Sequence, residues 1–311
     1  MMDTEKIYRL KDLSNWEFAG TAFAVIGQPI RHSLSPVMHN AVLQSAAESN
    51  LSIKDGSYFR FEIDPNDLTQ ALRLFYEKGF YGLNLTVPHK VMALDLISSV
   101  SEEAQAIGAV NTLKWSESGY MGYNTDGYGM RVGIAHSLKA ELKSNTVLIL
   151  GAGGAARAAA VECLKQKARS IWMLNRTQDR LEALLQSLSH LEGFDRLVPL
   201  VSSDPKALSL LEAEGICINA TSLGLGIQDP LPVDLEQLPL NWKVYDMVYN
   251  PPETALYRAA RAQGRSAATG LSMLVYQGAK AMELWSGQTV DPQCMFQAAQ
   301  RALDEQLSKD S

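Results

Sequence analysis

The most specific spacing of residues in the chain lies in VLILGAGGAARAAA, where Gly151, Gly153 and Ala156 fit the pattern G-x-G-x-x-G/A. An apolar run precedes the pattern and an alanine-rich run follows it, which is typical of a strand, a tight turn and a helix. The first glycine allows the bend, the second lets the backbone approach a pyrophosphate, and the small third residue lets the helix pack on the strand. Amide groups at the start of the helix would attract the phosphates. The pattern predicts a dinucleotide-binding turn; the alternative is an ordinary connection between a strand and a helix.

The end of the next predicted strand indicates which dinucleotide binds. This strand ends in Asn175-Arg176-Thr177, with Arg180 one helical turn further on, and the first carboxylate after it is that of Asp179. A site for NAD usually carries an acidic residue here, because a carboxylate binds the ribose 2′-hydroxyl. Two guanidinium groups and a hydroxyl suit a 2′-phosphate instead. The sequence therefore favours NADP, and the alternative is a solvated loop whose Thr177 begins a helix.

Four segments of the first half gather small hydroxyls and amides beside a lysine and an aspartate: GQPIRHSLSPVMHN, NLTVPHK, GAVNTL and NTDGYG. Each residue also has an ordinary structural explanation. Ser35 could cap a helix, Thr86 could fill a strand position, and Lys90 could be solvated. Asn111 and Asp126 could be turn residues. Taken singly, none of these segments predicts a site.

Taken in order, the motifs of the chain resemble the shikimate dehydrogenase family. The resemblance runs from about Ala22 to Trp285, nearly the whole chain. It is carried by H-S-x-S-P-x-x-H-N at 32–40, N-x-T-x-P-x-K at 84–90, G-A-V-N-T at 108–112, N-T-D-G at 124–127, the glycine turn, N-R-T at 175–177, N-A-T-S at 219–222, D-M-x-Y at 246–249 and G-L-x-M-L-V-x-Q at 270–277.

The resemblance implies a role for each matching residue. Lys90 and Asp126 would act at the reacting oxygen. The substrate would be bound through its carboxylate by Ser33 and Ser35, and around its ring by Thr86, Asn111, Tyr249 and Gln277. NADP would be held by Gly151, Ala152, Gly153, Gly154, Ala155, Asn175, Arg176, Thr177 and Arg180, with Met247 and Gly270 near its nicotinamide and Glu102 as a further cofactor-side candidate. No metal is expected.

The implied reaction is the reversible, NADP-dependent reduction of 3-dehydroshikimate to shikimate, on the route to chorismate and the aromatic amino acids. Two positions depart from the family pattern: Ser272 stands where glycine is usual, which could alter cofactor contacts near Gly270, and Leu225 replaces a methionine. Neither departure touches Lys90 or Asp126.

Three alternatives remain open from the sequence. An NAD-using quinate dehydrogenase would better fit an acidic residue at position 175, and a glycine in place of Ser35 would leave more room for an extra ring hydroxyl. A methylene-tetrahydrofolate dehydrogenase would leave the paired serines of HSLSP unexplained. A sensor that binds NADP without catalysis would not need an intact Lys90 and Asp126.

Short apolar runs alternate with helical patterns along the chain, which indicates an α/β fold with parallel sheets. In the first half we expect strands at 23–26, 58–63 and 82–87, helices from Ser35 and at 66–78 and 91–97, and a hairpin turned at Ser118-Gly119. In the second half we expect strands at 146–150, 171–174, 217–219, 244–247 and 267–268, and helices at 155–167, 273–285 and 292–306.

These elements predict two domains, and the resemblance implies a cleft between them. Residues 1–126 would form an α/β substrate domain, and residues 127–270 a Rossmann-type domain that binds NADP. The domain break is expected near 126–133, and the closing helices, within about 271–311, are expected to pack back onto the first domain.

Composition limits the classes of partner. The chain has 28 basic and 34 acidic residues, a net charge of −6, which argues against broad binding to nucleic acid or to acidic membranes. It has neither the apolar run of a membrane span nor a secretory signal, and its three cysteines suggest neither disulfides nor a metal cluster. We therefore expect a cytoplasmic protein, or one of an equivalent reducing compartment, that is a monomer or homodimer and acts on a small molecule.

Overall fold

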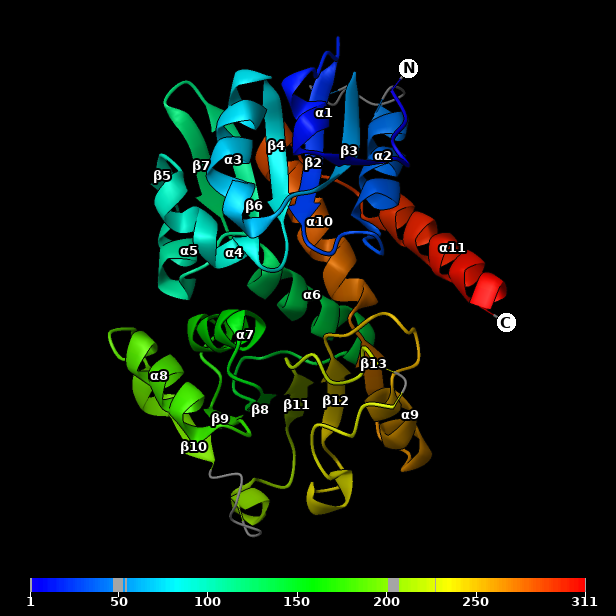
Figure 1. Ribbon diagram of the computed structural model, residues 1–311. Coiled ribbons are helices and arrows are strands. Elements are labelled where there is room, and N and C mark those ends of the chain that lie inside the picture. The colour runs from blue at the N-terminus through cyan, green and yellow to red at the C-terminus, as the bar shows by residue number, and fades with distance from the viewer. Residues whose placement is uncertain (1, 47–52, 54, 201–206, 227, 311) are drawn as a thin grey trace. The chain divides into compact units, whose positions relative to one another are not determined.

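The computed structural model describes residues 2–46, 53, 55–200, 207–226 and 228–310 of the chain (Figure 1). The chain divides into two compact units: unit 1 comprises Met1–Thr125 and Gln277–Ser311, and unit 2 comprises Asp126–Tyr276. Each unit is built on a sheet whose strands are mainly parallel and alternate with helices along the chain. The predicted α/β class is confirmed.

Unit 1 contains a seven-stranded sheet in the order β1-β3-β2-β4-β6-β7-β5. Its strands are β1 (Ile7–Arg9), β2 (Thr21–Gly27), β3 (Gly56–Glu62), β4 (Phe80–Leu85), β5 (Ser99–Val100), β6 (Thr112–Ser116) and β7 (Gly119–Tyr123). Strand β6 runs antiparallel to both β4 and β7, which confirms the predicted hairpin. The register places Asn84 of β4 directly opposite Thr112 of β6. Two polar residues far apart in the sequence therefore lie side by side.

The helices of unit 1 include α3, whose apolar spacing explains its position. Leu68, Ala71, Leu72 and Phe75 recur at helical intervals and are buried against the sheet core. The helical elements are α1 (Leu10–Ser14), α2 (Ser35–Ala46), η1 (Pro65–Asp67), α3 (Leu68–Glu77), α4 (His89–Met92), η2 (Ala93–Leu96), α5 (Glu102–Ile107), α11 (Gln293–Asp310) and the end of α10 (Leu271–Ser286).

Helix α10 reaches the sheet of unit 1 through Trp285. The indole nitrogen of Trp285 donates a hydrogen bond to the carbonyl of Leu113 (2.9 Å). Gly82 lies under the same ring, and any side chain at that position would collide with it. The glycine is thus required by the close approach of the helix to the strand.

One helix of unit 1 is shorter than predicted. Residues 91–97 were expected to form a single helix, but the chain forms the four-residue α4 and then the 3₁₀ turn η2. The carbonyl of Lys90 accepts a hydrogen bond from the amide of Val110 (2.8 Å). Because that carbonyl is engaged across the unit, the α-helical ladder is weakened at its start.

Unit 2 contains six parallel strands in the order β10-β9-β8-β11-β12-β13. They are β8 (Thr146–Leu150), β9 (Ser170–Leu174), β10 (Leu197–Leu200), β11 (Ile216–Asn219), β12 (Lys243–Asp246) and β13 (Ala267–Thr269). Counted from β8, the spatial order is 3-2-1-4-5-6, the Rossmann arrangement, in which ligands bind beyond the carboxyl ends of the strands where the order reverses. Here that point lies between β8 and β11.

The helices of unit 2 include one where the domain break was predicted. They are α6 (Asp126–Leu138), α7 (Gly154–Lys165), α8 (Gln178–Leu188), η3 (Phe194–Arg196), η4 (Ala207–Leu210), η5 (Leu235–Gln237), α9 (Ala255–Ala262) and most of α10. Residues 126–133, the expected break, belong to α6. A side chain at Gly133 would lie 2.5 Å from the Tyr245 hydroxyl, so glycine is needed for α6 to pack closely against Tyr245. Because glycine is uncommon inside helices, the same residue obscures the helical pattern in the sequence.

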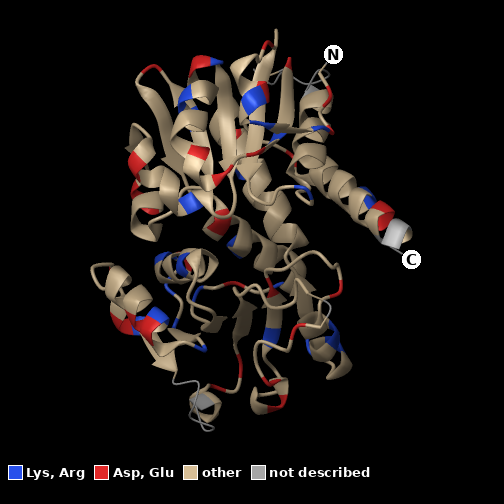
Figure 2. Ribbon diagram, viewed as in Figure 1, with Lys and Arg blue, Asp and Glu red and all other residues tan. Residues whose placement is uncertain are grey.

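Charged residues of both signs are interspersed on each unit (Figure 2). No helix in the described residues is long and apolar enough to cross a membrane.

Candidate functional site

The glycine turn joins β8 to α7 in the conformation that its sequence predicts. Gly151 has a φ of +114°, and a side chain there would lie 3.1 Å from the carbonyl oxygen of Ala220. At Gly153 and Gly154 an added Cβ would meet nothing within 4 Å, so the backbone faces open space. Helix α7 begins at Gly154 with no acidic residue in its first turn and no side chain bonded at its N-cap, Gly153. Its first amides are therefore open to an anion, which fits a pyrophosphate.

The end of β9 lies beside this turn. The amide of Gly151 donates to the carbonyl of Leu174 (2.8 Å), which directly precedes Asn175. The Asn175 side chain donates to the carbonyl of Thr177 (2.7 Å) and so shapes the loop before α8. Arg176 and Arg180 are exposed, and neither forms an ion pair within the described residues. These arginines fit a phosphate ligand.

Met247 and Gly270 lie together at the carboxyl ends of β12 and β13. A side chain at Gly270 would collide with the backbone of Met247, so only glycine allows this approach. Glu102, in contrast, belongs to unit 1, where it is exposed in the first turn of α5. Ser101 caps this helix, and an acidic residue in the first turn of a helix interacts favourably with its dipole. Helix stabilisation is thus an alternative explanation for Glu102.

The D-M-x-Y motif begins with a buried carboxylate that holds two loops. Asp246 accepts hydrogen bonds from the side chains of Asn219 (2.8 Å) and Thr254 (2.6 Å) and from the amide of Val248 (3.1 Å). Burial nevertheless raises the pKa of Asp246, and it also raises the pKa of the Tyr249 hydroxyl. Asp246 therefore orders the segment that carries Met247 and Tyr249.

Ser272, the departure from the family pattern, is buried within unit 2. Its hydroxyl lies 3.0 Å from those of Tyr245 and Ser137. The side chain is thus accommodated by neighbouring hydroxyls. Leu225, the other departure, is 62% exposed.

In unit 1, Asn111 is the centre of a buried polar cluster. Its side-chain oxygen accepts from the amide of Thr125 (2.8 Å), and its side-chain nitrogen donates to Thr125 Oγ1 (2.9 Å) and to Gln277 Oε1 (3.4 Å). The neighbouring residue Val110 is the one whose amide bonds the carbonyl of Lys90. The backbones of Lys90 and of Thr125, which directly precedes Asp126, are therefore both anchored at 110–111.

Two further predicted residues lie at the start of α2. Ser35 is buried and is the first residue of the helix, and its amide donates to Oγ of Ser33 (3.3 Å). A hydrogen bond links the Ser35 side chain to Tyr58. The carbonyl of Ser33 accepts from Arg60 (2.9 Å), which fixes the loop before the helix. The side chain of Ser33 therefore accepts from one of the first amides of α2.

Thr86 directly follows β4. Its amide donates to the carbonyl of Ile26 (3.0 Å), and its carbonyl accepts from the amide of His89 (2.9 Å). Thr86 therefore holds the turn that leads into α4 and Lys90.

Sequence reasoning assigned no role to several residues of the polar cluster. The motifs quoted above contain Asn84, Thr112 and Thr125, so the sequence could have identified these three residues as candidates. Tyr58 stands outside all of them, and only the folded sheet brings its hydroxyl to within 2.7 Å of Asn84 Oδ1.

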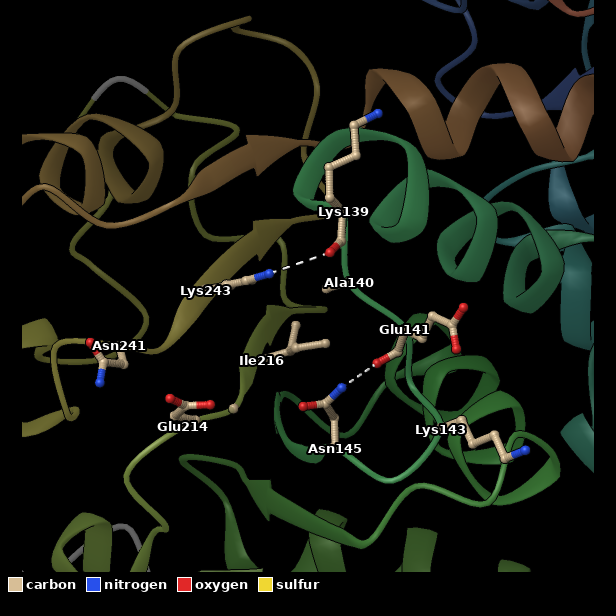
Figure 3. A pocket seen from close by; sticks show the side chains of 10 residues that line it. Lys139, Ala140, Glu141, Lys143, Asn145, Glu214, Ile216, Asn241 and Lys243 are labelled. Atoms are coloured by element: carbon tan, nitrogen blue, oxygen red, sulfur yellow. Dashed lines mark hydrogen bonds between the residues drawn. The ribbon is translucent and has the colours of Figure 1, made fainter.

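A pocket of about 350 Å³ lies at the amino ends of β8, β11 and β12 (Figure 3). Two of its polar side chains bond backbone carbonyls: Lys243 donates to those of Leu138 (3.1 Å) and Lys139 (3.5 Å), and Asn145 donates to that of Glu141 (2.7 Å). Lys243 thereby neutralises the end of α6. The pocket lies at the opposite ends of the strands from Gly151 and is not the nucleotide site.

Fold and site together define a class: an α/β oxidoreductase with a Rossmann unit for a dinucleotide and a second unit with a buried cluster of hydroxyls and amides around Asn111. Three family models match the chain. They describe a shikimate dehydrogenase substrate binding domain (residues 25–113), a shikimate/quinate 5-dehydrogenase (133–221) and a shikimate 5′-dehydrogenase C-terminal domain (270–300).

Individual relatives agree with these models. The chain is 38% identical to the shikimate dehydrogenase (NADP(+)) of Magnetococcus marinus over 86% of this chain and 91% of the relative. It is 39% identical to that of Methanococcoides burtonii over 91% and 98%. A crystal structure of shikimate 5-dehydrogenase from Thermus thermophilus, in complex with NADP(H) and shikimate, superposes with a TM-score of 0.78 at 36% identity and covers 91% of this chain and all of that one (100%). The chain belongs to the shikimate dehydrogenase family.

Proposed function

We propose that the protein catalyses the reversible reduction of 3-dehydroshikimate to shikimate with NADPH, on the route to chorismate and the aromatic amino acids. The observation that carries this proposal is the cluster around Asn111, which draws together Gln277, Thr125 and the backbone of Lys90 from four separate stretches of unit 1. A buried cluster of amides and hydroxyls suits a ring that bears several hydroxyl groups.

Lys90 and Asp126 act at the reacting oxygen. Reduction of a ketone needs a proton at oxygen when hydride reaches carbon, and a lysine ammonium can donate it or stabilise the charge. In the reverse direction the neutral amine accepts the hydroxyl proton. Asp126 is buried, at the start of α6, and acts with Lys90 as one unit.

Ser33 and Ser35 bind the substrate carboxylate. Hydroxyls are neutral donors, so they select a carboxylate without the strong attraction of a buried cation. Thr86, Asn111, Tyr249 and Gln277 bind the ring. This assignment uses residues of both units, since Tyr249 belongs to unit 2.

NADP is held by residues 151–155 of the turn and by Asn175, Arg176, Thr177 and Arg180. When bound, the cofactor supplies or accepts the hydride. The chain contributes the open amides at the start of α7, the exposed arginine side chains that follow β9, and the close approach of Met247 to Gly270. Glu102, which belongs to unit 1, is a further candidate for contact with the cofactor.

The protein works in the cytoplasm or an equivalent reducing compartment. All three cysteines are free thiols, and those of Cys163 and Cys217 are buried. Burial raises the pKa of the Cys217 thiol to about 12, so it is inert at neutral pH.

The test is a steady-state assay of NADPH oxidation with each of three candidate substrates. We expect turnover with 3-dehydroshikimate, at least tenfold lower kcat/KM with 3-dehydroquinate, and none with a methenyl-tetrahydrofolate substrate. Preference for 3-dehydroquinate would make the protein a quinate dehydrogenase. Tight NADPH binding without turnover of any substrate would make it a sensor.

A further inference from the structure

The hydroxyl of Tyr58 joins two parts of unit 1 that are far apart in the sequence. Tyr58 is fully buried in β3, and its hydroxyl donates to Oδ1 of Asn84 in β4 (2.7 Å). Its backbone is bonded on both sides to the Asn40 side chain of α2, with distances of 2.8 and 2.9 Å. The residue is therefore a junction between α2, which begins at Ser35, and the centre of the sheet.

The ring of Tyr58 also supports the first turn of α2. It stacks on the His39 ring with centroids 4.1 Å apart and an angle of 15° between the planes. Nδ1 of His39 donates to the carbonyl of Ser35 (2.8 Å). A shift of Tyr58 would thus displace His39 and, with it, the residue proposed to bind the substrate carboxylate.

From Asn84 the hydrogen bonds continue in one direction toward the ring-binding residues. The Asn84 side-chain nitrogen donates to Thr112 Oγ1 (3.0 Å), and Thr112 Oγ1 donates to Asn111 Oδ1 (3.0 Å). The side-chain nitrogen of Asn111 then donates to Gln277 Oε1. Each donor occupies an oxygen of the next residue. The chain of bonds therefore fixes which way the Asn84 amide faces and, together with the Thr125 amide, which way the Asn111 amide faces.

We infer that Tyr58 is a positioning residue, which sets the orientation and spacing of the carboxylate-binding Ser35 relative to the ring-binding Asn111 and Gln277. This inference rests on the proposed function. The Ser35 side chain bonds Tyr58, and its hydroxyl can rotate about the Cβ–Oγ bond toward an incoming carboxylate, so its oxygen need not move. Tyr58 itself does not contact the substrate.

The test variant is Tyr58→Phe, which removes one hydroxyl from the start of the chain of bonds. Asn84 Oδ1 loses its donor, the Asn84 side chain loses its fixed orientation, and the substrate can no longer satisfy both anchors at once. We expect KM for shikimate to rise about tenfold, the effect of roughly one hydrogen bond. We expect kcat to change less than threefold and KM for NADP to stay the same.

The matched control is Tyr120→Phe. Tyr120 is another buried tyrosine of unit 1, and its hydroxyl donates to the carbonyl of Phe80 (2.7 Å), outside the chain of bonds. This variant should lose comparable thermal stability with no change in KM. If both variants change Tm alike and neither changes KM, the Tyr58 hydroxyl is merely structural and the inference is wrong.

A double-variant cycle shows whether Tyr58 acts through the carboxylate anchor. In Ser35→Ala with Tyr58→Phe, KM should be close to that of Ser35→Ala alone, because the anchor is already lost. If the increases in KM caused by the two single substitutions multiply in the double variant, the inference is contradicted. An inactive wild type would overturn the proposed function instead.

A second pair of variants covers the case in which Tyr58→Phe does not fold. Thr112→Val breaks the chain of bonds at another point without changing volume much, and Thr112→Ser keeps the hydroxyl. We expect KM for shikimate to rise with valine and to stay within twofold of wild type with serine. Equal KM values in the two variants would contradict the inference.

Discussion

At the scale of single residues, we propose that Arg176 decides the choice of cofactor. It is exposed at the end of β9, next to the turn in which Gly153 and Gly154 face open space, and it has no ion-pair partner among the described residues. A structural arginine usually has a carboxylate or several carbonyl partners. We propose that Arg176 and Arg180 instead bind a phosphate beyond the NAD skeleton.

We predict that Asn175→Asp combined with Arg176→Ala admits NADH. Loss of one charge-assisted contact should cost about 2–3 kcal/mol, close to a hundredfold in NADPH affinity. The new carboxylate would bind a free 2′-hydroxyl and repel the phosphate. The measurement is kcat/KM for both cofactors, with Arg169→Ala as the control, because Arg169 pairs with Glu212 on the same unit. A wild type that uses NADH and NADPH equally would refute the NADP assignment.

At the scale of the element, α2 depends on a buried neutral histidine. Burial lowers the pKa of His39 from 6.5 to about 4. As the pH falls below 6.5, the unfolded chain binds this proton first, so the free energy of unfolding falls until the pH reaches the folded-state pKa.

We predict that between pH 7 and 4.5 the wild type loses about 2–3 kcal/mol more stability than His39→Gln does. Urea unfolding at several pH values measures this difference. His190→Gln, at an exposed histidine, should keep the wild-type pH dependence. Parallel curves for wild type and His39→Gln would show that His39 does not titrate in this range.

Helices α6 and α7 are held together by an ion pair in which the carboxylate is buried and the guanidinium is partly exposed. Nε of Arg131 lies 2.8 Å from Oε1 of Glu162, whose side chain is 2% exposed. Gln166 also donates to this oxygen (3.0 Å), while Oε2 of Glu162 has no partner within the described residues. Because α6 begins at Asp126, this pair fixes the helix that carries a proposed catalytic residue.

We predict that Arg131→Met destabilises unit 2 by about 2–4 kcal/mol, because it leaves a buried carboxylate without its cation. Arg131→Met combined with Glu162→Met should recover much of that loss. Arg73→Met, which breaks an exposed pair with Glu77, should cost less than about 1 kcal/mol. Urea unfolding of the wild type and these three variants measures the differences. A double variant no more stable than the single one would contradict the account of this pair.

At the scale of the whole molecule, the proposed substrate and cofactor sites draw mainly on different units. Hydride transfer requires the two reacting carbons to come into contact. We predict that NADP and shikimate together bring the units closer and reduce the radius of gyration, as ligand-driven domain closure does. Small-angle X-ray scattering with no ligand, each ligand alone and both together measures this change. Profiles that coincide in all four conditions would contradict closure.

The parts of this architecture that were predictable are those with local signals. The turn at Gly151 follows a buried strand and precedes an alanine-rich helix, so each neighbour supports the same interpretation of the sequence. Strand β8 was predicted residue for residue, because all five of its residues are apolar or small and buried.

Other parts depend on contacts that no local pattern encodes. The break after α4 follows from the bond between Lys90 and Val110, and α6 was missed because its glycines serve packing against Glu162 and Tyr245. The bond between Tyr58 and Asn84 exists only because β3, β2 and β4 are neighbours in the sheet. Local periodicity cannot reveal such a pairing.

The measurement that most directly tests the central claim is kcat for 3-dehydroshikimate reduction by NADPH in the wild type, Lys90→Ala, Asp126→Asn and the double variant. Each single change should lower kcat by about 10²–10⁴-fold, the usual scale for a lost acid–base group. The double variant should be little worse than the poorer single one, because the two residues act as a unit. Lys78→Ala, at an exposed lysine of the same unit as Lys90, should keep the wild-type rate. A Lys90→Ala variant with near-wild-type kcat, or a wild type that does not turn over 3-dehydroshikimate, would contradict the account.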